Sequence, residues 1–177
     1  MQIEEYKSLK SYNTFGIDCS ARYFASINSV SSLKQALSKG TSEELFILGG
    51  GSNMLLINDL NALVLHINIK GIEVVKETDS VVYLKAMAGE NWHNFVLHCI
   101  KNNFGGLENL SLIPGNVGTA PIQNIGAYGV ELKDTFVSCN TLEVDTLREK
   151  EFTKDEVKFE YRNSIFKNEV KNKYIIT

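Results

Sequence analysis

The residues best suited to chemistry in this sequence are glycines and amides, and the first group of them follows a short apolar run at residues 45–48. The group consists of Gly49, Gly50, Gly51, Ser52 and Asn53. Consecutive glycines let the backbone approach a ligand closely, and their N–H groups can hold an anion such as a diphosphate. The segment fits neither a P-loop nor a GxGxxG fingerprint, because it lacks the required lysine and the third glycine. On its own it is equally compatible with a plain glycine-rich turn.

A second group stands in a long segment, residues 105–129, that is rich in glycine and asparagine. Its flexible and polar positions are Gly115, Gly118, Thr119, Gln123, Asn124, Gly126 and Gly129. Backbone and side-chain amides can hydrogen-bond the edge of a heteroaromatic ring, so a loop that wraps a flavin and its ribityl chain would have this composition. An ordered surface loop in which Asn and Gly form turns is the alternative.

One arginine is set among aromatic residues near the end of the sequence. Residues 159–166 read Phe-Glu-Tyr-Arg-Asn-Ser-Ile-Phe, so Arg162 directly follows Tyr161. A guanidinium group held in this way can bind a carboxylate through two parallel hydrogen bonds. Arg162 is therefore a candidate for anion recognition, with a structural ion pair as the alternative.

The histidines and cysteines do not indicate a metal site. His93 and His98 lie about 140° apart around a predicted helix, so they do not share a face as metal ligands would. His66 stands alone near the end of a predicted strand, and we interpret all three histidines as structural or surface residues. The cysteines are Cys19, Cys99 and Cys139. They form no CxxC pair, so we interpret them as small buried hydrophobic residues in a reducing cytosol.

The composition is that of an ordinary globular chain, with 44% apolar and 22% charged residues among 177. A net charge of −3 gives no basic footprint for nucleic acid. No run of eighteen apolar residues is present, and the N-terminal residues lack the apolar core of a signal peptide. These features predict a cytoplasmic protein that binds neither nucleic acid nor membrane.

The elements that must position the first loop form a small α/β lobe over residues 1–70. Strands are predicted at 21–27, 45–48, 54–57 and 63–67, with the fully apolar run 45–48 typical of a buried parallel strand. A helix is predicted to begin after Ser29, with Leu33, Ala36 and Leu37 at helical spacing, and to end at Gly40.

The second loop belongs to a second lobe, residues 71–177. Strands are predicted at 72–75 and 81–86, and again at 136–144 and around Phe152. The apolar residues of the predicted helix 91–102 recur at i, i+3, i+4, i+7 and i+8. Residues 173–177 begin an apolar run and stop, which predicts that the sequence is a fragment of a longer protein.

Six blocks in order resemble the UDP-N-acetylenolpyruvoylglucosamine reductase family. They are residues 13–18 (Asn-Thr-Phe-Gly-Ile-Asp), 48–53, 88–92 (Ala-Gly-Glu-Asn-Trp), 106–110 (Gly-Leu-Glu-Asn-Leu), 113–129 and 161–166. The resemblance implies an α+β fold of the vanillyl-alcohol-oxidase (PCMH) type, with FAD between two α/β lobes. The six blocks run from residue 13 to residue 166, so the resemblance covers nearly the whole sequence.

The resemblance also assigns roles to residues. The first glycine loop would hold the FAD diphosphate through backbone amides, and the second would lie along the rest of the cofactor. The implied cofactor contacts are Gly49, Gly50, Gly51, Ser52, Asn53, Pro114, Gly115, Gly118, Thr119, Gln123, Asn124, Gly126 and Tyr128. Tyr161 and Arg162 match the substrate side, where Arg162 would stabilise enolate-like charge during catalysis.

The reaction implied is the NADPH-driven reduction of UDP-N-acetylglucosamine enolpyruvate to UDP-N-acetylmuramate for peptidoglycan synthesis, carried out by a monomer. The family's serine proton donor and its partner glutamate belong to a C-terminal substrate-binding domain that this sequence lacks. The fragment is therefore expected to keep an FAD site and not to complete the reaction alone. Another FAD oxidase or dehydrogenase is one alternative, weakened because no His or Cys falls between residues 45 and 60. A non-catalytic FAD-binding or nucleotide-binding module is the other.

Overall fold

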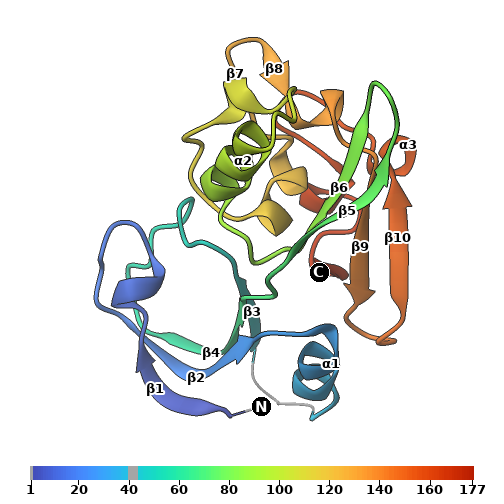
Figure 1. Ribbon diagram of the computed structural model, residues 1–177. Helices are drawn as coiled ribbons and strands as arrows, with labels where there is room; N and C mark the ends of the chain where they lie inside the picture. The colour runs from blue at the N-terminus through green and yellow to red at the C-terminus, as the bar shows by residue number, and fades with distance from the viewer. Residues whose placement is uncertain (1, 40–43) are drawn as a thin grey trace.

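The computed structural model describes residues 2–39 and 44–177, and a four-stranded sheet occupies its first part. The strands are β1 (Glu4–Ser8), β2 (Ser20–Ile27), β3 (Glu44–Leu48) and β4 (Leu60–Ile67). Their order is β1-β2-β4-β3, and β1 alone runs antiparallel to its neighbour. This sheet lies in the lower half of Figure 1. Because β2, β4 and β3 are parallel, their C-terminal ends share one edge, where the first glycine loop begins.

The helix α1 (Val30–Ser38) begins where the sequence predicts, after Ser29. The Ser29 hydroxyl accepts a hydrogen bond from the backbone N–H of Ser32 at 3.1 Å, and the Ser32 hydroxyl accepts one from the Ser29 N–H at 3.1 Å. Leu33 and Ala36 are buried against one face of the sheet. Full burial of a leucine such as Leu33 contributes about 1.5–3 kcal/mol. Gly40, the predicted end of the helix, lies outside the described residues.

Two strand predictions in this part need correction. Strand β3 is parallel as predicted but stands at the edge of the sheet, and Ile47 is 38% exposed, so the run is not fully buried. Residues 54–57 form no strand, although they alternate in burial as a strand would. Leu56 is buried in the core while Leu55 and Ile57 are exposed, yet no neighbouring strand pairs with this segment. The four apolar residues of this segment do not make it a strand, because a strand also needs a partner.

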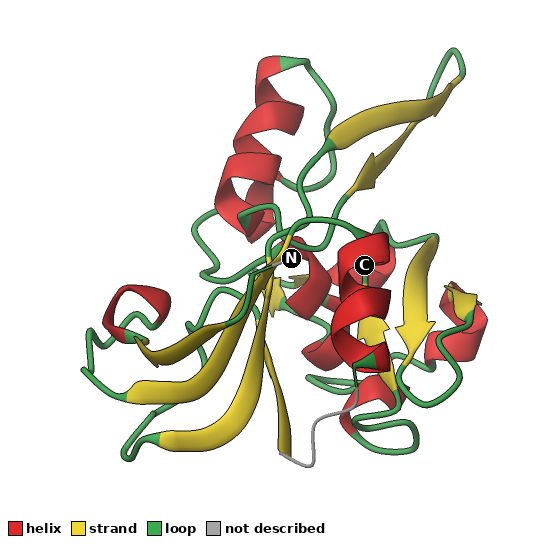
Figure 2. Ribbon diagram, turned by 90° about the horizontal axis from the view of Figure 1, so that it is seen from below, coloured by secondary structure: helices red, strands yellow, loops and turns green. Residues whose placement is uncertain are grey.

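The second part begins with a hairpin and a helix that project away from the first sheet (Figure 1 and Figure 2). The hairpin pairs β5 (Ile72–Glu77) with β6 (Val82–Ala86), and the helix is α2 (Trp92–Lys101). The Asn91 side chain caps α2 by accepting the Asn94 N–H at 3.0 Å. The predicted apolar face packs into a core with the loop that follows, except at the i+8 position, where Ile100 is 47% exposed. The buried residues of this core are Trp92, Phe95, Val96, Cys99, Leu110, Ala120, Ile125 and Leu132.

The long segment after α2 is irregular but held by short turns. Its elements are the 3-10 turns at Glu108–Leu110, Val117–Thr119 and Pro121–Gln123, the hairpin β7 (Gly126–Ala127) and β8 (Val130–Glu131), and a 3-10 turn at Leu132–Asp134. A three-stranded antiparallel sheet in the order β10-β9-β11 completes this part. Its strands and neighbours are β9 (Ser138–Glu143), β10 (Glu149–Thr153), α3 (Lys154–Val157), a 3-10 turn at Ile165–Lys167 and β11 (Tyr174–Ile176).

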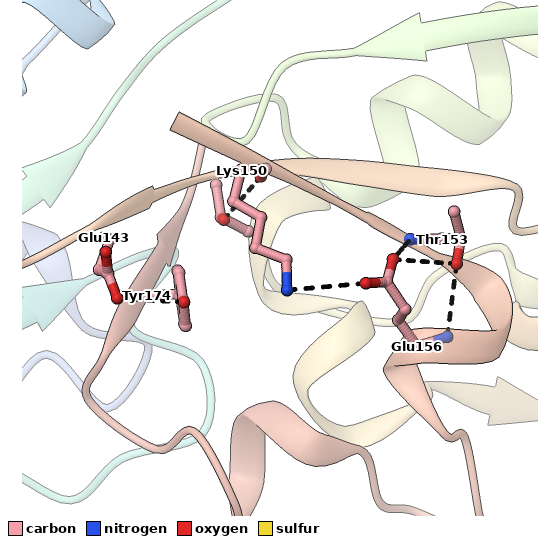
Figure 3. Close-up of polar contacts among 6 residues, drawn as sticks. Glu143, Lys150, Thr153, Glu156 and Tyr174 are labelled. Carbon is pink, nitrogen blue, oxygen red and sulfur yellow. Dashed lines mark hydrogen bonds and ion pairs between the residues drawn. The ribbon is translucent and has the colours of Figure 1, made fainter. Parts of the chain in front are cut away.

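Carboxylates on this sheet serve the fold. Glu156 accepts hydrogen bonds from the N–H and hydroxyl of Thr153, which starts α3, and lies 3.6 Å from the Lys150 ammonium (Figure 3). The bonds from Thr153 lower the pKa of Glu156. Glu143 accepts a hydrogen bond from the Tyr174 hydroxyl at 3.1 Å and ties β9 to β11. These groups are fully engaged in local structure, so none of them is a candidate acid or base.

The two parts of the chain share one hydrophobic cluster. Leu65 and Ile67 of β4 pack with Ala88, Leu142 and Ile175 from the second part. This shared core fixes the first sheet against the segment that carries the second glycine loop. The predicted boundary between lobes, residues 1–70 and 71–177, stays a prediction.

The three thiols are free, and all are expected to react slowly in the native protein. Burial raises the pKa of Cys19 and Cys99, and burial together with Glu151 raises the pKa of Cys139 to about 12. Because the thiolate is the reactive form, little nucleophile is present at pH 8. A chromogenic disulfide reagent should therefore label the thiols only slowly until denaturant is added. Rapid native labelling of any one thiol would contradict the packing described for that residue.

Candidate functional site

The two glycine-rich loops predicted from the sequence lie against each other. The Asn53 amide donates a hydrogen bond to the side-chain oxygen of Gln123 at 3.2 Å, which joins the loops directly. A Cβ atom at Gly49 would stand 2.6 Å from the Thr119 methyl carbon, and one at Gly50 would stand 2.9 Å from the Asn116 side-chain oxygen. The glycines are therefore required for this close approach.

The innermost glycine of the first loop is held by the block at residues 13–18. Gly51 has φ +62°, and a Cβ there would lie 1.9 Å from the carbonyl oxygen of Tyr12. The next residue, Asn13, is buried; its amide donates to the carbonyl of Leu9 at 2.8 Å, and its side-chain oxygen accepts the Ile17 N–H at 3.0 Å. Asn13 thus fixes the backbone on which Gly51 rests, a role that the sequence did not reveal.

The backbone of the first loop offers unused donors. Within the described ranges, the backbone N–H groups of Gly50, Gly51, Ser52 and Asn53 donate to no protein acceptor. Backbone N–H groups left free in a glycine-rich turn bind phosphate oxygens well, because they approach the anion without a side chain in the way. A diphosphate fits this part of the site.

The second loop rests on residues just before α2. The N–H of Val117 donates to the Glu90 carbonyl at 2.8 Å, and the N–H of Gly118 donates to the Ala88 carbonyl at 2.9 Å. A Cβ at Gly118 would meet the Ala88 Cβ at 2.5 Å. These two amides are consumed by the fold, so Gly118 serves close packing. The Thr119 hydroxyl donates to the Asn116 carbonyl at 2.8 Å and closes the turn.

Asn124 is fully buried within the second loop and has φ +44°. Its amide donates to the Glu160 carbonyl at 3.0 Å, and its side-chain oxygen accepts the Lys133 N–H at 3.1 Å. The amide thus joins the loop to the turn that carries Arg162, and the side-chain oxygen holds the 3-10 turn at Leu132–Asp134. The predicted contact between Asn124 and a cofactor stays a prediction, and its side chain acts here as a connector.

Arg162 packs against the C-terminal part of the second loop. It stands in a tight turn closed by mutual backbone hydrogen bonds between Glu160 and Asn163. Its guanidinium donates to the carbonyls of Gly126 and, at 3.4 Å, Asn124. In the described part of the chain Arg162 forms no ion pair, so the alternative of a structural ion pair is not supported. Among the described residues, no carboxylate lies within ion-pair distance of this positive charge.

The two predicted tyrosines are both strongly exposed. Tyr161, next to Arg162, is 81% exposed, and its ring centroid lies 5.6 Å from the Arg162 guanidinium carbon. Tyr128 is 88% exposed at the tip of the β7–β8 hairpin, where Tyr128 and Gly129 both have positive φ, as a two-residue hairpin turn requires. Pro114 is exposed at the surface of the second loop. The structure thus brings Tyr161 to Arg162 but leaves Tyr128 at a separate projecting turn.

His66 lies beneath the first loop, where the sequence predicted only a structural or surface histidine. It pairs with Leu48 across the strands, so it stands beside the start of the loop. Its ring packs edge-on against Tyr12 at 5.0 Å and stacks with Phe24 at 6.1 Å. Its Nδ1 atom is buried without a hydrogen-bond partner among the described residues. Burial, and secondarily Lys70, lowers the pKa of His66.

Protonation of His66 is expected to destabilise the protein as the pH falls. The folded pKa lies below the ordinary value of 6.5, so the unfolded chain binds more protons between the two values. Stability linked to His66 is therefore complete above pH 6.5 and declines as the pH falls toward the folded pKa. Urea unfolding between pH 5 and 8 should show this decline, and His66→Leu should reduce its slope. An unchanged slope in His66→Leu would contradict this assignment.

A separate cavity of about 800 Å³ lies in the second part of the chain. Its walls include Val82, Tyr83, Leu84, Trp92, Phe95, Ser138, Cys139 and Asn140. Within residues 105–129 the cavity touches Gly105, Leu107, Val117, Gly118, Ala120 and Pro121, and neither the first loop nor Arg162 lines it. This cavity is thus not the place where the two glycine loops meet.

The described residues contain no group of three His, Cys, Asp or Glu side chains that could hold a metal ion. Among the same residues, no helix has the length and apolar character needed to cross a membrane.

Comparison with known proteins finds a matching family and similar enzymes. The family model of the FAD binding domain matches residues 22–147. UDP-N-acetylenolpyruvoylglucosamine reductase of Flavobacterium johnsoniae is 59% identical over 177 residues, which is 100% of this chain and 52% of that protein. The enzyme of the same name from Amoebophilus asiaticus is 48% identical over 99% of this chain and 52% of its own length. The chain therefore spans about half the length of the curated relatives it matches.

A solved structure has the same fold. The UDP-N-acetylenolpyruvylglucosamine reductase of Thermus caldophilus aligns with a TM-score of 0.76 at 24% identity, over 100% of this chain and 60% of that one. The predicted α+β fold of the FAD-binding type is confirmed, and so is the resemblance to the reductase family. Since the FAD binding domain model spans most of the sequence, this chain belongs to the FAD-binding domain family.

Proposed function

We propose that this chain is the FAD-binding part of a UDP-N-acetylenolpyruvoylglucosamine reductase. The whole enzyme would use NADPH to reduce UDP-N-acetylglucosamine enolpyruvate to UDP-N-acetylmuramate, a step of peptidoglycan synthesis. The observation that carries the proposal is the junction of the two glycine loops, where the backbone N–H groups of residues 50–53 have no acceptor among the described residues. Identity of 59% along the whole chain supports the substrate assignment.

The residues present fit FAD in two ways. The free N–H groups of Gly50, Gly51, Ser52 and Asn53 would hold the diphosphate. Gln123, joined to Asn53, would mark the passage from the diphosphate to the part of the loop that follows the ribityl chain and the ring. The remaining proposed contacts of the second loop are Pro114, Gly115, Gly118, Thr119, Asn124, Gly126 and Tyr128.

Arg162 is the proposed catalytic residue of this chain. Its guanidinium is fixed by the carbonyls of Asn124 and Gly126, so it would face the reacting end of the substrate with its orientation already set. Bound FAD would supply the two-electron chemistry that links NADPH to the enolpyruvyl double bond. Arg162 would stabilise negative charge on the substrate carboxylate as that charge grows in the transition state. Tyr161, exposed beside it, would contact the substrate.

We further propose that residues 1–70 and 71–177 act as two lobes with FAD between them, and that the enzyme is a cytoplasmic monomer. The three free thiols are typical of a reducing compartment. The proton donor of the reaction would come from the part of the enzyme that this chain does not include.

A visible absorption spectrum tests the proposal. The purified chain is titrated with FAD, and NADPH is then added without oxygen, with NADH as the control reductant. We expect a perturbed spectrum of oxidised flavin that NADPH bleaches, with one NADPH oxidised per flavin, and no further oxidation of NADPH when the enolpyruvyl substrate is added. A spectrum identical to that of free FAD at every protein concentration would contradict an FAD site in this chain. Binding without bleaching would favour a non-catalytic FAD-binding module.

A further inference from the structure

The first turn of α2 holds the second glycine loop through several hydrogen bonds. The backbone N–H of Trp92 donates to the Gly115 carbonyl at 3.0 Å, and its indole N–H donates to the Leu110 carbonyl at 2.8 Å. Between these two points, the Nδ1 atom of His93 lies 3.0 Å from the Ser111 hydroxyl oxygen and 3.3 Å from the Leu112 nitrogen. The start of the loop is thus attached to α2 by the indole of Trp92 and the imidazole of His93.

The contact with Leu112 determines which nitrogen of His93 carries a proton. A backbone N–H can only donate, so Nδ1 must accept. The Ser111 hydroxyl then donates to the same nitrogen, and the proton of the neutral ring resides on Nε2. The one in-plane lone pair of Nδ1 is therefore shared between donors of two consecutive residues of the loop.

Leu112 needs this support because its backbone is strained. Its φ is +61°, a conformation that leucine rarely adopts, and its side chain is 77% exposed, so packing does not hold it in place. The chain reverses here and then reaches Gly115, where a Cβ would stand 3.1 Å from the Ser52 hydroxyl. The position of Leu112 therefore sets how the second loop meets the first.

We infer that His93 is a positioning residue for the cofactor: its Nδ1 atom, by accepting from Ser111 and Leu112, fixes the loop that the proposed function places along FAD. The inference rests on that proposed function for its consequence, whereas the hydrogen bonds themselves can be tested without FAD. His93 forms its side-chain hydrogen bonds with Ser111 and Leu112 and with no glycine of either loop. It therefore acts on the loops through the backbone that it holds.

The first test needs no cofactor. Long-range ¹H–¹⁵N spectra of the full chain should show His93 with a proton on Nε2 and none on Nδ1. The Leu112 amide should exchange with solvent slowly in the unmodified chain and about fivefold faster in His93→Leu, because a lost hydrogen bond of this kind is worth about 1 kcal/mol. A proton on Nδ1, or unchanged exchange at Leu112, would overturn the inference.

The second test measures FAD affinity in matched variants. His93→Leu removes the acceptor, whereas His93→Asn places an oxygen near the position of Nδ1. We expect His93→Leu to weaken FAD binding about tenfold and His93→Asn to restore it to within about threefold. His98→Leu is the control on the same helix, because the His98 ring forms no hydrogen bond among the described residues.

These outcomes separate the two claims. Equal loss of affinity in His93→Leu and His93→Asn would mean that the imidazole merely fills space, and would overturn the positioning role. If the unmodified chain binds no FAD, the proposed function fails, and the tautomer and the Leu112 exchange rate still decide whether His93 holds the loop.

Discussion

Replacing Gly51 with alanine is expected to destabilise the protein by about 2–6 kcal/mol and to abolish binding of FAD. The residue has φ +62°, where a non-glycine residue costs about 1–3 kcal/mol. The new Cβ would stand 1.9 Å from the Tyr12 carbonyl oxygen and 2.9 Å from the Asn13 Cα, so backbone must move, at a further cost of about 1–3 kcal/mol. Urea unfolding and FAD titration measure the two effects.

Gly16→Ala is the matched control for this experiment. Gly16 has nearly the same backbone angle, φ +63°, but a Cβ there meets nothing within 4 Å. It should cost only the strain of the left-handed conformation, about 1–3 kcal/mol. Because both variants share that strain, their difference isolates the collision with the segment at Tyr12. Equal destabilisation of the two variants would show that the Gly51 loop can move away, contrary to the tight contact described.

The second large effect is expected at Arg162, in a reductase that contains this chain. Arg162→Ala should lower kcat roughly 10²–10³-fold, the usual effect of removing one preorganised donor from a site of developing negative charge. Arg162→Lys should recover only part of this loss, because an ammonium group cannot reproduce the planar fork that reaches both Asn124 and Gly126. Steady-state kinetics with the enolpyruvyl substrate measure the effect.

Arg148→Ala provides the control for charge alone. Arg148 is exposed after β9, and it lines neither glycine loop. Its removal should leave kcat within about twofold, as for most exposed substitutions. If Arg162→Ala also keeps kcat within about threefold, the arginine only stabilises the turn between Glu160 and Asn163, and the catalytic proposal is wrong.

Much of the fold could be predicted because the decisive signals are local. The serines at the start of α1 and the apolar spacing along α1 and α2 indicated where both helices lie. The strands predicted at 21–27 and 63–67 are β2 and β4. Residues 54–57 show the limit of such local signals, since an apolar run suggests a strand and only the absence of a paired neighbour excludes one.

The candidate site was predictable in its residue types but not in its connections. Three adjacent glycines imply close backbone approach, yet they do not say that Thr119, Asn116 and Tyr12 are what they approach. The contacts of His93 with Ser111 and Leu112 join residues eighteen and nineteen positions apart, and no periodic pattern encodes them. Such pairings depend on how the loop folds back on α2, which only the three-dimensional structure reveals.

The most direct test of the central claim is to map the backbone amide shifts of the chain during titration with FAD. The large shifts should fall on Gly50, Gly51, Ser52 and Asn53 and on the second glycine loop, with little change along β9 and β10. Shifts confined to β6 and to the apolar face of α2 would place the ligand in the separate cavity of about 800 Å³, and would contradict the assignment of the two glycine loops as the FAD site.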